Sequence, residues 1–260
     1  MKKIIINVIF LVLAIALLIF NYPIGNEIAF ILIGIFITSI YDFLIEYAGS
    51  IRMLFKILKN WNKPVRISFA YLYRIKVRNK YLLIMGNRIK KYQPVGGVYK
   101  FYDIHNLQRM GFNEMDEMKA DGQNDKDLRG KIKAQNLPRL IKWFESQKCR
   151  EYDANREFNE ELIYSKILDA KIFRNIEYKK EKSIHSGIIK TPNYGLEYKI
   201  FDIIELLPNK EQKEYLENLM LNNNNEQICF VSEDEIRKHR REIPSEDYTN
   251  DITDHSESII

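Results

Sequence analysis

Residues 156–162 read Arg-Glu-Phe-Asn-Glu-Glu-Leu, and this short segment decides how the larger part of the chain is interpreted. The apolar residues in and around it fall on one face of a helix: Ala154, Phe158, Leu162 and Ile163. Glu157, Glu160 and Glu161 then occupy positions i, i+3 and i+4, so their carboxylates converge on one side. The segment is therefore predicted to be a helix that carries an acidic cluster.

The three glutamates allow two interpretations. Close carboxylates repel one another, whereas a hard divalent cation would turn that repulsion into ligation. Oxygen ligands suit Mg²⁺ or Mn²⁺, so Glu157, Glu160 and Glu161 are candidate metal ligands and candidate catalytic residues. The alternative is an acidic face in contact with water, as on many surface helices. The triplet by itself leaves both interpretations open.

Upstream of this helix the sequence has the two-residue period of β-strands. Residues 65–77 alternate apolar and polar side chains, Asn79-Lys80 is predicted to turn, and residues 81–85 form a second apolar run. The chain then reaches Pro94-Val95-Gly96-Gly97. Paired glycines after a strand indicate either a close approach of the backbone to another group or a simple bend.

This order of elements resembles the Nudix hydrolase family, whose signature is Gly-x5-Glu-x7-Arg-Glu-aliphatic-x-Glu-Glu-x-Gly-aliphatic. The second half of the signature matches position for position at Arg156, Glu157, Phe158, Glu160 and Glu161. Residues 75–85 resemble the opening hairpin of the family, Gly96-Gly97 its paired glycines, and residues 230–236 its closing passage from strand to helix. The resemblance covers roughly residues 65–240. It implies an α+β fold, a Nudix-like α/β/α sandwich with a mixed sheet, in which Gly96, Gly97 and Arg156 contact a ligand.

The chain departs from the signature in its first half. The upstream Glu of the family falls at Lys148, the preceding Gly at Lys142, and the trailing Gly at Ile163. More than fifty residues separate Gly97 from Arg156, so an insertion is expected at about residues 98–150. It contains a predicted loop at 121–125 and a predicted short helix at 137–144. These departures leave hydrolysis open.

The N-terminal region has a different composition. Residues 4–20 and 28–41 are almost wholly apolar, and 17 residues span about 26 Å as a helix. Residues 21–27 between them are predicted to turn. Residues 1–48 are therefore predicted to form a transmembrane helical hairpin that inserts in the lipid bilayer. A cleaved signal peptide is the alternative for the first run.

Basic residues flank the hairpin on one side only. Lys2 and Lys3 precede the first apolar run, five basic residues follow the second, and the turn carries none: Arg52, Lys56, Lys59, Lys63 and Arg66. The positive-inside rule places both termini and the main domain in the cytoplasm, which predicts a two-pass protein of the inner membrane. Residues 49–64 alternate apolar and basic residues, as in an amphipathic helix that rests on anionic headgroups.

Composition restricts the remaining function classes. Two cysteines, Cys149 and Cys229, exclude a disulfide scaffold and a cysteine-built zinc site. The net charge of +5 is largely explained by the juxtamembrane basic residues, and no stripe of aromatic and basic residues indicates a DNA surface. Residues 242–260 contain acidic residues and no Lys or Arg, so this tail is predicted to be disordered.

Two apolar runs followed by a diverged Nudix-like domain resemble the membrane-anchored Nudix proteins of bacterial cyclic-nucleotide antiphage systems (CBASS). The resemblance implies an effector that senses a cyclic oligonucleotide made by a cGAS-like nucleotidyltransferase. The domains would then associate as a homo-oligomer, and the hairpins would disrupt the inner membrane and abort the infection. The alternatives are a membrane-anchored, Mg²⁺-dependent hydrolase of a nucleoside diphosphate-type substrate and a membrane scaffold with an inactive domain.

Overall fold

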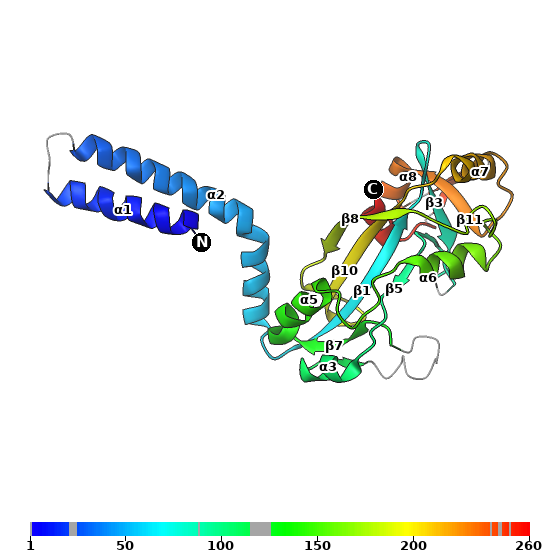
Figure 1. The fold of residues 1–260 in the computed structure, drawn as a ribbon, viewed down its shortest axis with the longest axis horizontal. Coiled ribbons are helices and arrows are strands. Elements are labelled where there is room, and N and C mark those ends of the chain that lie inside the picture. Colours follow the sequence, from blue (N-terminus) through cyan, green and yellow to red (C-terminus); the bar gives the residue numbers. More distant parts are fainter. Residues whose placement is uncertain are drawn as a thin grey trace. The chain divides into compact units, whose positions relative to one another are not determined.

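The computed structural model describes residues 2–20, 25–87, 89–114, 126–239, 241–243, 246–249 and 251–260 (Figure 1). The chain divides into two compact units, Met1–Lys59 and Asn60–Ile260. The boundary falls close to the predicted start of the domain at residue 65.

The first unit contains the helices α1 (Lys2–Phe20) and α2 (Gly25–Lys59), so both predicted apolar runs are helical. Ala14 and Ala29 have no exposed surface, and small residues of this kind let two helices approach closely. The helix α2 continues to Lys59 but bends between Asp42 and Tyr47, a few residues before the predicted boundary between the hairpin and the linker. Of the turn predicted at residues 21–27, residues 21–24 lie outside the described residues, and residues 25–27 already belong to α2, so the prediction is wrong for them.

The predicted membrane spans are not confirmed. Within the part of the chain that the structure describes, no helix taken alone has the length and apolar character needed to cross a membrane. Two parts of α2, Glu27–Asp42 and Tyr47–Lys59, meet that requirement only together and are bent by 63°. The apolar stretch Ile9–Ile19 of α1 is shorter. The two spans therefore stay a prediction.

The second unit is organised around the long strand β1. Among the described residues, seven strands form one sheet in the order β6-β7-β1-β10-β8, with β5 paired to β1 and β9 paired to β10. The strand β10 runs parallel to β1, whereas β5 and β7 run antiparallel to it. These strands are β1 (Pro64–Arg74), β5 (Gly96–Val98), β6 (Asn113–Glu114), β7 (Arg129–Lys133), β8 (Tyr178–His185), β9 (Ile189–Thr191) and β10 (Gly195–Leu206).

A smaller sheet contains the predicted hairpin. Its strands are β2 (Lys76–Val77), β3 (Lys80–Met85), β4 (Tyr92–Gln93) and β11 (Ile228–Ser232). The chain leaves the larger sheet at Ile75, so the predicted strand 65–77 is divided between two sheets. The turn lies at residues 78–79, one residue before its predicted position. A separate antiparallel pair is formed by β12 (Arg241–Ile243) and β13 (Glu246–Thr249).

The two faces of β1 are covered by different parts of the domain. Phe69 and Tyr73 lie on one face, where they contact the rings of Phe144 and Phe158 at centroid distances of 4.7 and 5.3 Å. These two rings belong to the helices α5 (Leu137–Glu145) and α6 (Asn155–Phe158). Leu72 belongs to a buried cluster that also contains residues of β3, β11 and the C-terminus. The mixed α+β class and the mixed sheet are confirmed.

The remaining helical elements complete these layers. They are α3 (Ile104–Arg109), α7 (Lys210–Leu221) and α8 (Glu233–Arg237), with the short elements η1 (Ala134–Asn136), η2 (Asn159–Ile163) and η3 (Asp254–Ile259). The helix α8 follows β11 directly, and Ser232 and Glu235 form a capping box at its start. The predicted passage from strand to helix at residues 230–236 is confirmed.

The segment expected as an insertion at residues 98–150 contributes to the central sheet. Its strand β7 pairs with β1, with Val65 opposite Ile132, and its helix α5 covers the aromatic face. The short helix predicted at 137–144 is confirmed as α5. The loop predicted at 121–125 lies outside the described residues.

The prediction of a disordered tail over residues 242–260 is wrong for the last part of the tail, residues 251–260. Ile252 and Ile259 have no exposed surface and belong to the buried cluster around Leu72. The side chain of Arg74 donates a hydrogen bond to the carbonyl oxygen of Ile259, and the side chain of Lys182 donates one to Ile260. The prediction was based on the acidic composition of the tail as a whole, and it overlooked the few apolar side chains that pack against the core of the domain.

Candidate functional site

The acidic segment lies on two short helical elements that are fixed by their apolar side. Phe158 of α6 and Leu162 of η2 have no exposed surface, as the predicted helical face requires. The element η2 is a π-helix, in which the backbone N–H of Tyr164 donates to the carbonyl oxygen of Asn159 at 2.8 Å. The predicted helix is therefore confirmed, but it widens at Asn159. Such π-turns occur frequently at functional sites.

The six candidate residues line one cavity of about 620 Å³. The acidic segment forms one side, and the β5 region and β7 form the others. The lining residues are Asn87, Ile89, Gln93, Gly96, Gly97, Val98, Lys100, Asp127, Arg129, Arg156, Glu157, Glu160 and Glu161. The structure thus brings together all the residues that the sequence singled out, and their chemical roles stay predictions.

Arg156 holds the acids of this cavity together. Its guanidinium donates to both oxygens of Glu151, at 2.9 and 3.2 Å, and to Glu157 at 2.5 Å. It also donates to the carbonyl oxygen of Val98 at 3.0 Å and lies 3.6 Å from Glu160. Burial lowers the pKa of Arg156, but the hydrogen bond to Glu151 and the charge of Glu157 outweigh this and raise it. The guanidinium is therefore a permanent internal cation of the site.

Glu151 is a site residue that the sequence comparison missed. The signature places its upstream glutamate at Lys148, and the structure supplies a carboxylate from a position three residues later. Glu151 is buried and also accepts the backbone N–H of Lys100 at 3.1 Å. An acidic residue close to the expected position was the signal in the sequence that could have identified Glu151. The fixed spacing of the signature pointed to residue 148 instead.

Glu161 is the most perturbed acid of the cavity. Burial, with the negative charges of Glu157 and Glu160, raises its pKa from 4.5 to about 8, although its hydrogen bond from Gly96 opposes the shift. That bond joins the backbone N–H of Gly96 to Oε2 of Glu161 at 2.9 Å. Burial also raises the pKa of Glu157, against the opposing charge of Arg156. At neutral pH Glu161 is therefore mainly protonated.

The paired glycines allow two close approaches. A Cβ atom on Gly97 would lie 1.9 Å from Oε1 of Glu157, and a Cβ atom on Gly96 would lie 2.2 Å from the carbonyl oxygen of Tyr71. The interpretation that the backbone passes close to another group is confirmed. The neighbouring groups are the carboxylate of Glu157 and the backbone of β1.

Three further charged residues of the cavity come from the segment expected as an insertion: Lys100, Asp127 and Arg129. Arg129 and Asp127 lie 3.8 Å apart as an ion pair. Sequence reasoning missed them because only the pairing of β7 with β1 carries Arg129 to the cavity. Lys100 and Arg129 supply positive charge opposite the glutamates.

The donor chemistry of the glutamates fits Mg²⁺ or Mn²⁺, because carboxylate oxygens are their usual protein ligands. Their arrangement is less suited to a metal, since Arg156 binds Glu157 and the N–H of Gly96 binds Glu161. Within the described ranges no three acidic, imidazole or thiol side chains are grouped as the ligands of one ion.

Comparison with known families identifies the family to which this domain belongs. The sequence profile of the SMODS-associated NUDIX domain matches residues 64–260, which include the whole acidic cavity. No curated protein and no solved structure is significantly similar to the chain. Because the match covers most of its length, the chain belongs to the SMODS-associated NUDIX domain family.

Proposed function

We propose, from this membership of the SMODS-associated NUDIX domain family, that the chain is a membrane-anchored antiviral effector. Its domain binds a cyclic oligonucleotide made by a partner nucleotidyltransferase. The domains of several copies then associate, and the helical hairpins disrupt the inner membrane and abort the infection. The association with SMODS systems in the family description supports the link to a nucleotide-synthesising partner.

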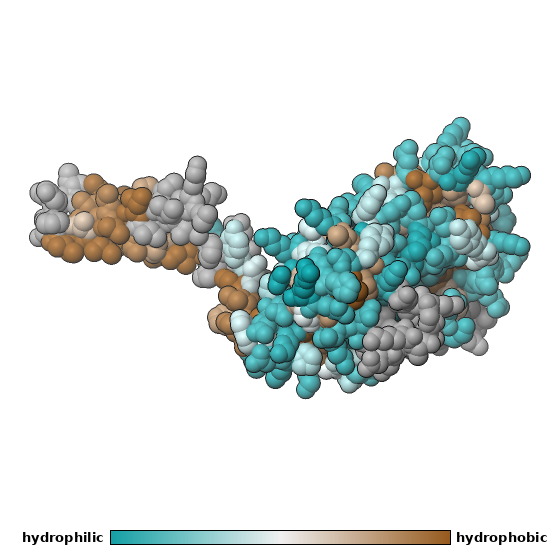
Figure 2. Space-filling model, turned by 60° about the horizontal axis from the view of Figure 1, so that its bottom comes forward, coloured by the Kyte–Doolittle hydropathy of each residue, from teal (hydrophilic) through white to brown (hydrophobic). Residues whose placement is uncertain are grey.

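The surface of the first unit supports a lipid partner. Apolar side chains of α1 and α2 are largely exposed, among them Val12, Ile19, Phe30 and Ile31 at 60–72%. Figure 2 shows hydrophobic residues gathered over these helices. Exposed apolar surface of this extent is costly in water, so the helices require an apolar partner. We infer that the partner is the bilayer, with both chain ends in the cytoplasm.

The end of α2 supports contact with lipid headgroups. Leu54, Phe55 and Leu58 are exposed at 53–66%, and basic residues alternate with them. An apolar face beside Lys and Arg suits the boundary of an anionic membrane. This segment would keep the domain near the bilayer on which it acts.

The ion pairs of Arg156 are the observation that favours a sensing function over a catalytic one. This guanidinium already neutralises Glu151 and Glu157, so the cavity does not require a divalent cation to offset its acids. A binding domain needs only a preorganised site, and Gly96, Gly97 and Arg156 remain candidates for ligand contact. Ligand binding drives assembly only if the assembled state binds the ligand more tightly.

A second candidate function is hydrolysis of a nucleoside diphosphate-type substrate. It is favoured by the buried Glu161, whose pKa of about 8 lies close to the operating pH of a general acid or base. Glu157 and Glu160 would hold Mg²⁺, which when bound would neutralise the diphosphate and activate a water molecule, and Glu161 would then remain as the general acid or base. Gly96 would orient Glu161 through its N–H.

One experiment on the full chain in detergent separates the two functions. Calorimetry measures binding of cyclic di- and trinucleotides, and chromatography follows the same compounds and nucleoside diphosphates with Mg²⁺. We expect binding with the nucleotide recovered intact, also for Glu161→Gln. Mg²⁺-dependent cleavage that Glu161→Gln abolishes would instead establish the hydrolase. Absence of binding for every cyclic nucleotide would refute the sensor.

A further inference from the structure

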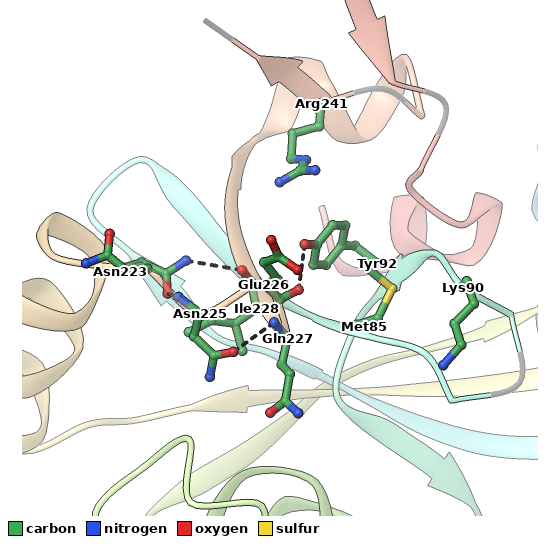
Figure 3. A pocket seen from close by; sticks show the side chains of 10 residues that line it. Met85, Lys90, Tyr92, Asn223, Asn225, Glu226, Gln227, Ile228 and Arg241 are labelled. Atoms are coloured by element: carbon green, nitrogen blue, oxygen red, sulfur yellow. Dashed lines mark hydrogen bonds between the residues drawn. The ribbon is translucent and has the colours of Figure 1, made fainter. Parts of the chain in front are cut away.

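A second cavity of about 690 Å³ lies within the domain, lined by none of the residues that line the acidic cavity (Figure 3). Its walls come from the end of β3, the start of β4, the loop before β11 and the start of β12. The lining residues are Met85, Lys90, Tyr92, Asn223, Asn224, Asn225, Glu226, Gln227, Ile228 and Arg241. Its volume falls within the range of small-molecule sites.

The two cavities differ in how far their cations are already paired. In the acidic cavity Arg156 binds Glu157 and Arg129 pairs with Asp127, so acids of the same cavity offset these two cations. In the second cavity Arg241 pairs with Asp251, whereas Lys90 makes no ion pair with any described residue. A ligand with several phosphates is attracted most by a cation that no neighbouring acid offsets. The second cavity is therefore the better host for a polyanion.

Its cationic groups are available to a ligand. Asp251 accepts a hydrogen bond from Nε of Arg241 at 3.2 Å and forms an ion pair with Nη2 at 3.0 Å, which leaves Nη1 without a partner among the residues described. The guanidinium is oriented by the ring of Tyr92, whose centroid lies 4.7 Å away. Lys90 is exposed and makes no ion pair with any described residue. Figure 3 shows Arg241 and Lys90 on different sides of the cavity.

The loop before β11 adds neutral hydrogen-bonding groups. Asn223 accepts the N–H of Asn225 at 3.0 Å and donates to the carbonyl oxygen of Ile228 at 3.1 Å. Asn225 accepts the N–H of Gln227 at 2.9 Å. These bonds fix the loop, while the amide nitrogen of Asn225 and the side chain of Gln227 make no bond to the described residues. Free carboxamides pair well with the edges of nucleobases.

We propose that this second cavity is the nucleotide-binding site of the domain, with Lys90 and Arg241 on the phosphates and Asn225 and Gln227 on a base. The inference rests on the proposed function, because it gives the location of the sensed nucleotide. The cavity at Gly96 and Gly97 is the competing location.

The test measures the affinity of the full chain in detergent for cyclic di-AMP, cyclic di-GMP and cyclic tri-AMP. Lys90→Glu reverses a charge on the cavity wall, and Lys91→Glu makes the same change one residue away, outside the lining. We expect Lys90→Glu and Gln227→Leu each to weaken the tightest ligand by about tenfold or more. Lys91→Glu, Arg129→Gln and Glu161→Gln should change its affinity less than about twofold, near the neutral level of uninvolved contacts.

The other outcomes overturn the proposal in whole or in part. Equal weakening by Lys90→Glu and Lys91→Glu would reduce the effect to net charge. Weakening confined to Arg129→Gln and Glu161→Gln would place the nucleotide in the acidic cavity, and sensing would survive. Pyrophosphate that binds as tightly as the cyclic nucleotide would refute base contact by Gln227. No binding of any nucleotide would refute both the location and the sensor.

Discussion

The two units of this chain treat the same kind of side chain in opposite ways. Phe30 of α2 is 66% exposed, whereas Phe158 of α6 has no exposed surface and packs 5.3 Å from Tyr73. The domain buries its apolar residues against itself, while the buried apolar residues of the helices, among the side chains described, are Ala14, Ala29 and Ile57. The domain therefore has its own core and the hairpin needs an external one, which the proposed function assigns to lipid.

The largest loss of stability should come from removing the C-terminal residues, because this exposes apolar residues of the domain core to water, like those of the hairpin. Deletion of residues 251–260 removes Ile252 and Ile259, both without exposed surface, and opens the cluster around Leu72. We expect a loss of roughly 5 kcal/mol or more, enough to unfold many domains. Thermal unfolding of the deletion measures this, with Asp254→Ala as the surface control. An unchanged melting temperature of the deletion variant would show that the tail does not contribute to the core and would support the original prediction of disorder.

A somewhat smaller effect is expected from Arg156→Ala. The substitution leaves the buried carboxylate of Glu151 and that of Glu157 without their shared cation. Loss of one partner from a buried pair costs about 3–5 kcal/mol, and Arg156→Lys should recover little because Lys lacks the planar fork. Denaturant unfolding measures the cost, and Arg139→Ala at an exposed position is the control. Equal stability of the two alanine variants would contradict the role given to Arg156.

The same glycine substitution should differ between the two units. Gly96→Ala would place a Cβ 2.2 Å from the carbonyl oxygen of Tyr71, whereas Gly49→Ala on α2 meets no atom within 4 Å. We expect Gly96→Ala to destabilise the domain by about 1–3 kcal/mol through overpacking. Gly49→Ala should leave the domain unchanged and favour its helix by up to about 1 kcal/mol. Unfolding of the domain and helical content by circular dichroism test the pair.

An effect of similar size concerns the pH dependence of Glu161. Its pKa is about 8 in the folded domain and near 4.5 when solvated, so the folded state keeps a proton that the unfolded chain loses. Its contribution is complete below pH 4.5 and is lost as the pH rises to about 8, which destabilises the domain. Glu161→Gln has no such loss and should gain about 1–3 kcal/mol relative to the parent between pH 5 and 8.5.

Thermal unfolding of both proteins across that pH range measures this difference. Glu214→Gln is the control, because Glu214 is exposed on α7 and lines neither cavity. Parallel curves for the parent and Glu161→Gln would show that Glu161 is ionised and solvated in the folded domain.

Much of the fold was predictable because it depends on local patterns. The alternation in residues 65–77 predicted β1, and the apolar face at Phe158 and Leu162 predicted the helical segment. The alternation did not reveal that Ile75 ends the first sheet, because that bend is set by pairing with distant strands. Burial of the tail was missed for a similar reason, since two isoleucines among acids carry little signal before their partners are known.

The acidic cavity was half predictable. Matching the signature found Arg156, its three glutamates and the glycines, which lie in one cavity. The same spacing pointed to Lys148 in place of Glu151. An acid three residues further along the loop still reaches Arg156 and forms the ion pair, but it no longer has the sequence spacing that the signature requires. Lys100 and Arg129 reach the cavity only through pairing within the sheet. The second cavity had no signal, since Lys90 lies more than one hundred residues before both the loop at 223–227 and Arg241.

The most direct test of the proposed function uses the full chain in dye-filled vesicles of phosphatidylethanolamine and phosphatidylglycerol. Dye release is followed after addition of the cyclic nucleotide that binds most tightly, with a non-binding nucleotide as the control. We expect release that requires the binding nucleotide and that Lys90→Glu reduces in proportion to the lost affinity. Tight binding with no release, or cleavage of the nucleotide with the vesicles intact, would contradict it.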